Sequence, residues 1–406
     1  MFHIQFPKYH TQTLAVKLKP AAEKLMLQSA HPWIYSDSID KVNKTGAAGD
    51  IVILFRQKTN KVFGVGLYDP DSPIVIKMLH YYSGITINKD FFADLIKKAF
   101  ALRKSLLETD TNSYRLLFGE NDGMPGCIID CYADVAVVKL YSSIWFPYLK
   151  EISEIVIEIT QCSALVLRLS RHLQALRDDV FHDGQVLYGA LKDEIVIFKE
   201  HGVLFAANVV KGHKTGYFLD HRENRRKVGA LAKGKTVLDV FAYTGGFSVH
   251  ALAGGAKAVT SIDISKQALE SANENVRLNS FTGKHLTVTG DAFNILEQLE
   301  KSKQQFDIVV IDPPSFAKRE TEIDVAKKKY RQLAHMGAAL TAPNGYLILA
   351  SCSSRVTAEI FFEEIQKELN ASPVTFKLLA HTFHDIDHPV TFKEGAYLKC
   401  AYYQRK

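Results

Sequence analysis

The chain has 406 residues, of which 47% are hydrophobic and 23% are charged, with a net charge of +6. One hydrophobic core rarely organises this length, so two or three domains are expected, and the composition excludes intrinsically disordered, collagen-like and disulfide-dense proteins. No apolar run approaches the roughly 20 residues of a membrane span and no signal peptide is apparent, so a cytoplasmic protein without a membrane partner is expected.

The charge is unevenly distributed along the chain. Residues 1–90 carry 11 Lys and Arg against 7 Asp and Glu, residues 91–205 carry 12 against 16, and residues 206–406 carry 27 against 21. The basic outer parts, with patches at 221–227 and 327–331, suit a nucleic acid partner, although solvated helix faces would explain such patches equally well. The five cysteines show no C-x-x-C spacing, which indicates free thiols in a reducing compartment.

The first 85 residues are predicted to form a small β-barrel domain. A helix is expected at 21–30, followed by strands at 51–55, 62–67 and 74–78 that turn residues separate.

Residues 86–205 are predicted to form a mixed α/β connector domain. Helices are expected at 91–107 and 148–160, two strands around a tight turn within 127–139, and a strand at 164–169. A hairpin with strands at 194–200 and 202–206 would close this part.

Residues 206–406 alternate strands with helices, which predicts a doubly wound, mostly parallel α/β sheet with helices on both faces. Strands are expected at 236–241, 258–262, 286–289, 306–311, 346–351, 375–379 and 397–403. Helices are expected at 246–253, 266–278, 292–301, 323–340 and 359–369. Ligands of such sheets bind at the carboxyl ends of the strands.

The first strand–helix turn of this sheet, residues 239–247, does not suit a pyrophosphate. It lacks G-x-G-x-x-G, which disfavours a nicotinamide dehydrogenase, and it has no P-loop lysine. Three successive strands nevertheless end in an acid, namely Asp239, Asp263 and Asp291. Asp263 has the spacing of a ribose-binding carboxylate, and Asp291 with Phe293 could hold an adenine. Each acid alone would more simply cap the next helix, but together they suit S-adenosyl-L-methionine (SAM).

Segment 239–247, Asp263, Asp291 and the Asp-Pro-Pro-Ser-Phe sequence at 312–316 resemble the motif series of class I SAM-dependent methyltransferases. Segments 118–126, 214–226 and 387–399 narrow the resemblance to the RlmI-type 23S rRNA cytosine-C5 methyltransferases. The N-terminal domain, with segment 31–35, resembles the RNA-binding PUA domain of that family. The resemblance implies a Rossmann-like catalytic domain and a 23S rRNA substrate, protein-free or partly assembled, and it allows a homodimer.

The same resemblance implies a set of cofactor-binding residues, including a segment before the first strand that folds over SAM. These residues are Tyr217, Phe218, Arg222, Asp239, Phe241, Ala242, Tyr243, Thr244, Gly245, Asp263, Ile264, Asp291, Ala292, Phe293 and Asp312.

Asp312 and Cys352 each follow a strand, and these two strands are expected to lie side by side, about 5 Å apart. A thiolate that adds to carbon 6 of a cytosine makes carbon 5 nucleophilic enough to accept a methyl group. We therefore predict Cys352 as the nucleophile and Asp312 as the group that holds the base and assists protonation at N3, with Arg355 lowering the pKa of the thiol. The alternative is a buried, structural cysteine, as expected for Cys127, Cys131, Cys162 and Cys400.

Three other interpretations remain open from the sequence. The Asp-Pro-Pro-Ser-Phe segment also suits methylation of a guanine or an exocyclic amino group without covalent catalysis, and Cys352 distinguishes the two chemistries. A non-catalytic RNA-binding scaffold is the non-enzymatic alternative. His381, His384 and His388 suggest a metal site, but Pro389 favours a loop there and no metal is expected.

Overall fold

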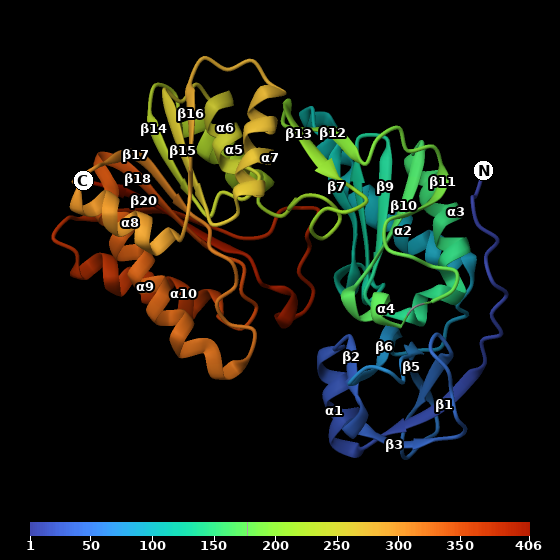
Figure 1. The fold of residues 1–406 in the computed structure, drawn as a ribbon. Coiled ribbons are helices and arrows are strands. Elements are labelled where there is room, and N and C mark those ends of the chain that lie inside the picture. Colours follow the sequence, from blue (N-terminus) through green and yellow to red (C-terminus); the bar gives the residue numbers. More distant parts are fainter. Residues whose placement is uncertain (177) are drawn as a thin grey trace. The chain divides into compact units, whose positions relative to one another are not determined.

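The chain folds into two units in the computed structural model, which describes residues 1–176 and 178–406 (Figure 1). The first unit comprises Met1–Phe198, Ala207–Leu219 and Ile386–Phe392. The second comprises Lys199–Ala206, Asp220–Asp385 and Lys393–Lys406. Each unit is thus assembled from separate stretches of sequence. The predicted borders at 85/86 and 205/206 would instead divide the chain into three continuous domains. These borders stay predictions.

The N-terminal part of the first unit is a six-stranded sheet of order β2-β6-β5-β4-β1-β3. Only β1 and β4 pair in parallel. Leu14, Val16 and Leu18 of β1 are fully buried, since alternate residues of a strand face the same side of a sheet. The elements are β1 (Thr13–Leu18), α1 (Pro20–Ser29), β2 (Trp33–Tyr35), β3 (Ile39–Val42), β4 (Ile51–Phe55), β5 (Val62–Tyr68) and β6 (Ile74–Tyr81).

The predicted helix and three strands of this part are all present. β1, β2 and β3 are not predicted from the sequence. β3 has only four residues, two of them charged, so it carries little strand signal.

The rest of the first unit centres on a five-stranded sheet of order β11-β10-β9-β8-β7. Strands β9 and β10 are parallel and are connected through α3, whereas the other neighbours are antiparallel. The elements are α2 (Lys89–Arg103), β7 (Ser113–Phe118), β8 (Cys127–Tyr132), β9 (Val135–Leu140), α3 (Leu149–Thr160), β10 (Ala164–Leu169), α4 (Arg171–Ala175) and β11 (Gln185–Gly189). A two-stranded hairpin follows, formed by β12 (Ile195–Glu200) and β13 (Val203–Asn208).

The second unit contains a seven-stranded sheet of order β16-β15-β14-β17-β18-β20-β19. Its first five strands in this order are parallel, and β20 is antiparallel to both of its neighbours. The strands are β14 (Thr236–Val240), β15 (Ala258–Asp263), β16 (Lys284–Thr289), β17 (Phe306–Ile311), β18 (Thr341–Ser351), β19 (Phe376–Thr382) and β20 (Lys399–Arg405). The helices are α5 (Arg222–Leu231), α6 (Gly246–Ala253), α7 (Lys266–Arg277), α8 (Ala292–Lys301), α9 (Ile323–Leu340) and α10 (Ala358–Ala371).

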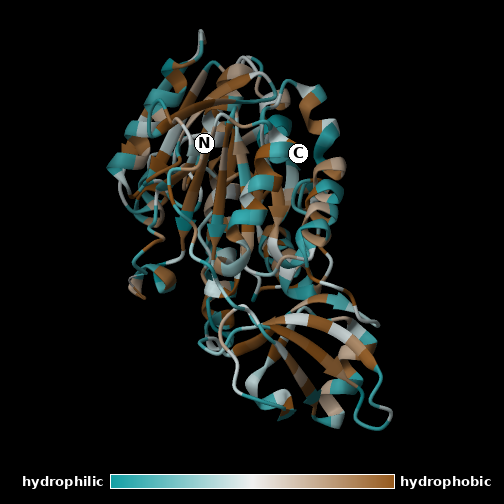
Figure 2. Cartoon of the chain, turned by 90° about the vertical axis from the view of Figure 1, so that its right-hand side faces the viewer, coloured by the Kyte–Doolittle hydropathy of each residue, from teal (hydrophilic) through white to brown (hydrophobic). Residues whose placement is uncertain are grey.

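Two hydrophobic cores cover the two faces of this sheet. Ile308 and Val310 of β17 pack in the core that α5 and α6 share. Val309 and Ile311, the alternate residues of that strand, pack in the core that α8, α9 and α10 share. Hydrophobic residues accordingly dominate the strands, whereas the helices carry both hydrophobic and hydrophilic residues (Figure 2). The predicted doubly wound sheet is confirmed.

None of the helices in the described part of the chain is long and apolar enough to cross a bilayer.

Candidate active site

The carboxyl ends of the parallel strands place most of the predicted site residues along one edge of the sheet. Asp239 and Asp263 lie at the ends of β14 and β15, and Asp291 shortly follows β16. Asp312 and Cys352 come directly after β17 and β18. Parallel pairing brings these ends together.

The turn between β14 and α6 has an unusual backbone. Phe241, Tyr243 and Gly245 have φ angles of 64°, 50° and 78°, in the left-handed region that favours glycine. A Cβ at Gly245 would lie 2.8 Å from the Cβ of Ala272, so a larger residue would clash there. The Tyr243 amide donates to Asp263 Oδ2 at 2.9 Å, which ties the turn to the end of β15. Such strained turns concentrate at ligand-binding sites.

Asp239 faces the start of α6 and is buried. Its Oδ2 accepts from the Ser248 amide at 3.0 Å and from the Ser248 hydroxyl at 2.6 Å. Burial raises the pKa of Asp239 to about 7, although the Ser248 hydrogen bonds oppose this. A cationic ligand near this carboxyl would favour its ionised form.

The outer part of the predicted cofactor site is more open. Ile264 is 74% exposed beside the Asp263 carboxylate, which leaves an apolar surface next to a hydrogen-bond acceptor. Asp291 caps α8 by accepting from the Asn294 amide at 3.1 Å, as the simpler interpretation of a strand-end acid expects. The ring of Phe293 lies 6.5 Å from Phe241.

The residues of this edge fit SAM. A carboxylate at Asp263 suits ribose hydroxyls, an exposed apolar side chain at Ile264 suits an adenine face, and the turn at 241–245 permits close backbone approach. Thr244 lies in the turn at 241–245, and Ala292 is the first residue of α8. Thr244 Oγ1 is buried without a hydrogen-bond partner in the described structure. The individual contacts stay predictions.

Three predicted cofactor residues lie before β14. Tyr217 and Phe218 belong to the first unit, where Tyr217 packs on Phe198 with ring centroids 5.1 Å apart. Arg222 is fully buried in the second unit, and its guanidinium pairs with Asp385. Their predicted role over the cofactor stays a prediction.

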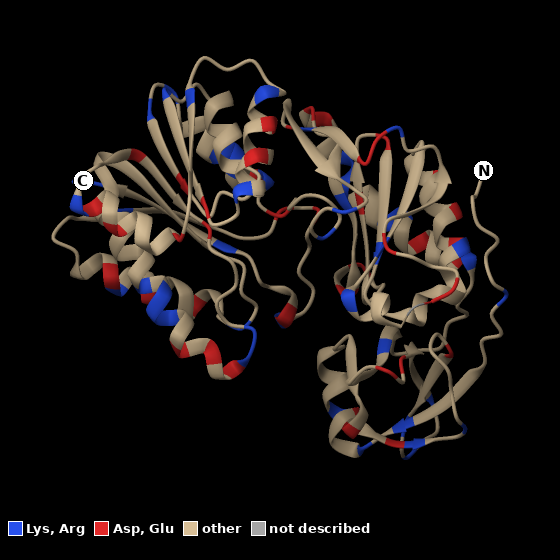
Figure 3. Ribbon diagram, viewed as in Figure 1, with Lys and Arg blue, Asp and Glu red and all other residues tan. Residues whose placement is uncertain are grey.

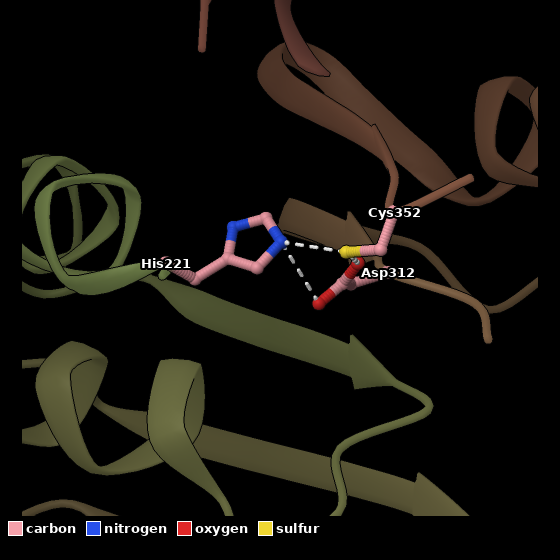
Figure 4. A group of neighbouring side chains, drawn as sticks. All are labelled: His221, Asp312 and Cys352. Atoms are coloured by element: carbon pink, nitrogen blue, oxygen red, sulfur yellow. Dashed lines mark hydrogen bonds and ion pairs between the residues drawn. The ribbon is translucent and has the colours of Figure 1, made fainter. Parts of the chain in front are cut away.

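Asp312 and Cys352 meet, as predicted from the positions of their strands. Cys352 Sγ lies 3.8 Å from Asp312 Oδ1 (Figure 4). His221, just before α5, completes a group of three side chains, with Nε2 3.5 Å from Cys352 Sγ and 3.3 Å from Asp312 Oδ2.

The hydrogen bonds behind His221 fix its tautomer. Thr382 Oγ1 and Tyr402 OH donate to Asn224 Oδ1 at 2.6 and 3.0 Å, so the Asn224 amide nitrogen points to His221 Nδ1 at 3.1 Å. Because that amide donates, Nδ1 accepts and the proton of the neutral imidazole is on Nε2. His221 therefore offers a donor to Asp312 and Cys352.

The electrostatics of the group favour a protonated thiol in the free protein. Burial and the neighbouring Asp312 carboxylate raise the pKa of Cys352 well above its ordinary value. Burial opposes a charge on His221, but Asp312 outweighs it and raises the pKa of His221.

Lys399 of β20 holds the loop that carries Cys352. Its buried Nζ donates to the backbone carbonyls of Ser353, Val356 and Tyr397. Burial lowers the pKa of Lys399 to about 8. The charge of Lys399, not of the exposed Arg355, opposes the rise in the pKa of Cys352. The net shift is still upward, so the predicted lowering of this pKa is wrong.

His221, Asp312 and Cys352 are also the one group of described residues whose potential metal-ligand atoms all lie within 4.8 Å of one another. Zinc binds such nitrogen, oxygen and sulfur donors, but it would need a lone pair on Nε2, where the network places a proton. The three histidines at 381–388 have separate contacts instead. His381 stacks on Phe362, His384 accepts from the Leu398 amide, and His388 contacts Asp387.

His221, Asn224 and Lys399 are not predicted as site residues from the sequence. Their positions relative to Cys352 come from folding, because more than a hundred residues separate His221 from Cys352. The basic patch at 221–227 and the resembling segments at 214–226 and 387–399 were the only signals available.

Comparisons with known proteins agree with this geometry. Residues 127–396 match the model of an S-adenosylmethionine-dependent methyltransferase family, and residues 16–81 match that of a PUA-like domain. The chain is 40% identical over 405 residues to a ribosomal RNA large subunit methyltransferase of Deinococcus radiodurans, covering 98% of this chain and 99% of that protein. It is 34% identical over 394 residues to ribosomal RNA large subunit methyltransferase I of Shewanella frigidimarina, covering 95% and 98%.

Among solved structures, the chain is similar to SMU.776, described as a methyltransferase complexed with SAH. The TM-score is 0.80 at 25% identity, covering 97% of this chain and all of the other.

Proposed function

Since the chain belongs to the S-adenosylmethionine-dependent methyltransferase family, we propose that it methylates carbon 5 of a cytosine in the RNA of the large ribosomal subunit. The cofactor of this family is SAM, which supplies an electrophilic methyl group when bound. Two relatives that match nearly the whole chain are named for large-subunit ribosomal RNA. The expected 23S rRNA target before complete assembly, and the homodimer, stay predictions.

One observation carries the choice of cytosine carbon 5, namely the contact between Cys352 Sγ and Asp312 at the ends of β17 and β18. Methylation of an amino group needs only groups that hold the base. A thiol beside the carboxylate supplies what carbon 5 additionally requires, a nucleophile that adds to carbon 6.

The proton of the thiol has a path. As Cys352 Sγ bonds to carbon 6, the proton passes to Asp312 Oδ1, the nearest acceptor, and Asp312 delivers a proton to N3 of the base. The raised pKa of Cys352 keeps the thiol protonated in the free protein. The thiol ionises only when the bound base offsets the negative charge of Asp312. After the methyl group has been added, removal of the carbon 5 proton by a base expels Sγ as a thiolate. The N3 proton then returns through Asp312 to the sulfur, which restores both the thiol and the neutral base.

His221 acts as a hydrogen-bond donor in this proposal. Its Nε2–H stabilises negative charge on Asp312 and on the sulfur. Asn224 is a positioning residue, because its amide keeps the proton of the imidazole on Nε2.

The test compares Cys352→Ala with the matched control Cys162→Ala, in which a buried cysteine of the first unit is changed. We expect Cys352→Ala to bind SAM with unchanged affinity in calorimetry and to lose methyl transfer to transcribed 23S rRNA. The control should keep both. Mass mapping of the wild-type product should locate the methyl group on carbon 5 of a cytosine.

RNA that contains 5-fluorocytidine gives a second measurement. Carbon 5 then carries no removable proton, so the wild type should remain covalently attached through Cys352. Turnover by Cys352→Ala, with the methyl group on a guanine or an amino group, would replace the proposal with the non-covalent chemistry. Failure to bind SAM at all would favour the RNA-binding scaffold.

A further inference from the structure

A cavity of about 470 Å³ opens in the first unit at the carboxyl ends of β9 and β10. None of the described residues that line it is acidic. The basic ones among them are Lys139, Arg168, Arg171, Lys211, His213 and Lys214. Over the molecule, Lys and Arg are interspersed with Asp and Glu (Figure 3), and residues 91–205 have a surplus of acids. The composition of this segment therefore gives no sign of the cavity.

Two of the lining cations are buried side by side. Lys139 and Arg168 are register partners on the parallel strands β9 and β10, so their side chains share a face of the sheet. Like charges in such a pair destabilise it unless they are offset. Arg168 is offset, because its Nε donates to Asp183 Oδ1 at 3.0 Å and its Nη2 to the Gly212 carbonyl at 3.0 Å.

Lys139 has no comparable partner. Its Nζ reaches the Leu169 carbonyl at 3.4 Å, and among the residues that the structure describes no carboxylate lies within ion-pair distance of it. Burial and the charge of Arg168 lower the pKa of Lys139 to about 8. An anion in the cavity would supply the missing negative charge.

The rest of the cavity adds positive charge and one aromatic ring. Arg171 and Lys214 are exposed, and Lys211 pairs with Glu194 at 2.8 Å. The ring of Tyr141 is 39% exposed and has Lys139 Nζ 5.9 Å from its centre. Proteins bind single-stranded nucleic acids with such groups: arginine and lysine contact the phosphates, and an exposed aromatic ring stacks on a base.

We propose that this cavity binds a phosphate of the RNA substrate, with Lys139 and Arg168 at its base, Arg171 and Lys214 at its rim and Tyr141 available to stack a neighbouring base. The inference rests on the proposed function in that it takes RNA as the substrate. It adds a backbone-binding site in the first unit, separate from the residues that act on the base. Tyr141 favours a nucleic acid over free phosphate.

The experiment measures the affinity of the full chain for a labelled 20-nucleotide oligocytidylate and for transcribed 23S rRNA at several salt concentrations. Arg171→Ala/Lys214→Ala removes two exposed cations of the rim. Lys97→Ala/Lys98→Ala removes two exposed cations of α2 that do not line the cavity and is the matched control. We expect the slope of log affinity against log salt to become shallower by about 0.7 in the rim variant, the value for one lost phosphate contact, and to change little in the control.

Lys139 gives a second readout. An amine with a lowered pKa reacts readily with amine-modifying reagents at pH 8, so mass spectrometry should find Lys139 modified in the free protein and protected by the oligonucleotide. Lys139→Met, which keeps the length and packing of the side chain, should weaken RNA binding without changing SAM affinity.

Equal salt slopes for the rim variant and the control, or modification of Lys139 that RNA does not reduce, would overturn the proposal. Equal protection by inorganic phosphate, with no loss of RNA affinity in the rim variant, would identify a site for the free anion instead. These readouts do not require methyl transfer, so a wild-type protein that shows them without methylating cytosine would disprove the proposed function alone.

Discussion

Asp312 has two opposite effects on Cys352, which makes its substitution informative. Its carboxylate raises the pKa of the thiol, and in the proposed reaction it also accepts the proton of that thiol. Asp312→Asn should therefore make Cys352 more reactive and the enzyme inactive.

The measurement is the rate of alkylation of Cys352 by iodoacetamide from pH 6 to 10, read by mass spectrometry. The midpoint of this rate should shift to lower pH in Asp312→Asn, while methyl transfer falls at least about 100-fold, the lower range for loss of a general acid–base group. The four other cysteines are buried and serve as internal controls. An unchanged midpoint would show that Asp312 does not control the thiol.

Asp239 should make both stability and SAM binding depend on pH. Its pKa is about 7 in the folded protein against an ordinary value of 3.8, so the folded state holds the proton more tightly than the unfolded state. The resulting stabilisation is fully present at low pH and is lost as the pH rises toward 7. Between pH 5 and 8 this residue alone should lower the free energy of unfolding by about 2 to 3 kcal/mol.

Asp239→Asn should abolish that pH dependence in urea unfolding. It should also bind SAM about 10 to 100 times more weakly, since hydrogen bonds to charged groups contribute about 1.5–3 kcal/mol. In the wild type, calorimetry in buffers of different ionisation enthalpy should detect proton release on SAM binding near pH 7. SAM binding without proton release would contradict this role.

The tautomer of His221 can be tested through Asn224. Asn224→Leu removes the amide that donates to Nδ1, so the imidazole can place its proton on either nitrogen. We expect methyl transfer to fall about tenfold, the effect of losing one hydrogen bond of about 1.4 kcal/mol, with unchanged SAM affinity. Nitrogen NMR of His221 reports the tautomer directly, and a spectrum identical to that of the wild type would refute the positioning role.

At the scale of elements, the hairpin β12–β13 fastens two helices of the second unit through Glu200. This buried carboxylate pairs with Arg225 of α5 through both of its oxygens at 2.7 Å and with His250 of α6 at 2.8 Å. Burial opposes ionisation of Glu200, but Arg225 and His250 prevail and hold its pKa below the ordinary range. The pair therefore stabilises the fold above about pH 4.3 and loses this effect as the pH falls further.

Glu200→Gln leaves the buried Arg225 without its counter-charge and should cost about 3 to 5 kcal/mol in urea unfolding at pH 7. The control is Glu270→Gln on α7, whose exposed pair with Lys266 should contribute less than about 1 kcal/mol. Similar losses of unfolding free energy in the two variants would show that the buried Glu200–Arg225 pair stabilises the fold no more than the exposed pair does.

Most strands and helices of the second unit were predicted from their apolar periods, but α5 was not, because its sequence carries mainly charged and polar residues. The rule that successive strands of a parallel sheet lie side by side predicts the pairing of β17 with β18, and with it the meeting of Asp312 with Cys352. The same rule does not predict that β17 lies beside β14. The insertion of β20 between β18 and β19 was not predictable. It requires β20 to pair with β18, from which a long stretch of sequence separates it. The same contact brings Lys399 to the Cys352 loop, which explains why Arg355 was the wrong candidate.

At the scale of the whole molecule, the interleaved segments predict how the chain responds to cutting. Thr215 Oγ1 donates to Asp130 Oδ2 at 2.6 Å, and Asp387 Oδ2 accepts from the Arg115 amide at 3.0 Å, all within the first unit. A fragment of residues 1–205 would lack Thr215 and Asp387 and leave their buried partners exposed.

We expect fragment 1–205 to unfold at lower urea concentration than fragment 1–219, which restores Thr215. Both should unfold before the first unit does in the full chain. Circular dichroism at several urea concentrations would show the order. Equal urea midpoints for the two fragments and for the first unit in the full chain would support the predicted border at 205/206 as the end of an independent domain.

The placement of β20 between β18 and β19 has a further consequence for the cell. Every other strand of that sheet precedes it in the chain, so an interrupted product that stops before residue 399 lacks both the central partner of β19 and the amine that anchors the Cys352 loop. Such a product could still form the motifs that resemble a cofactor site, yet it could not present the sulfur. Premature termination should therefore yield an inert polypeptide rather than a methylating enzyme of relaxed selectivity.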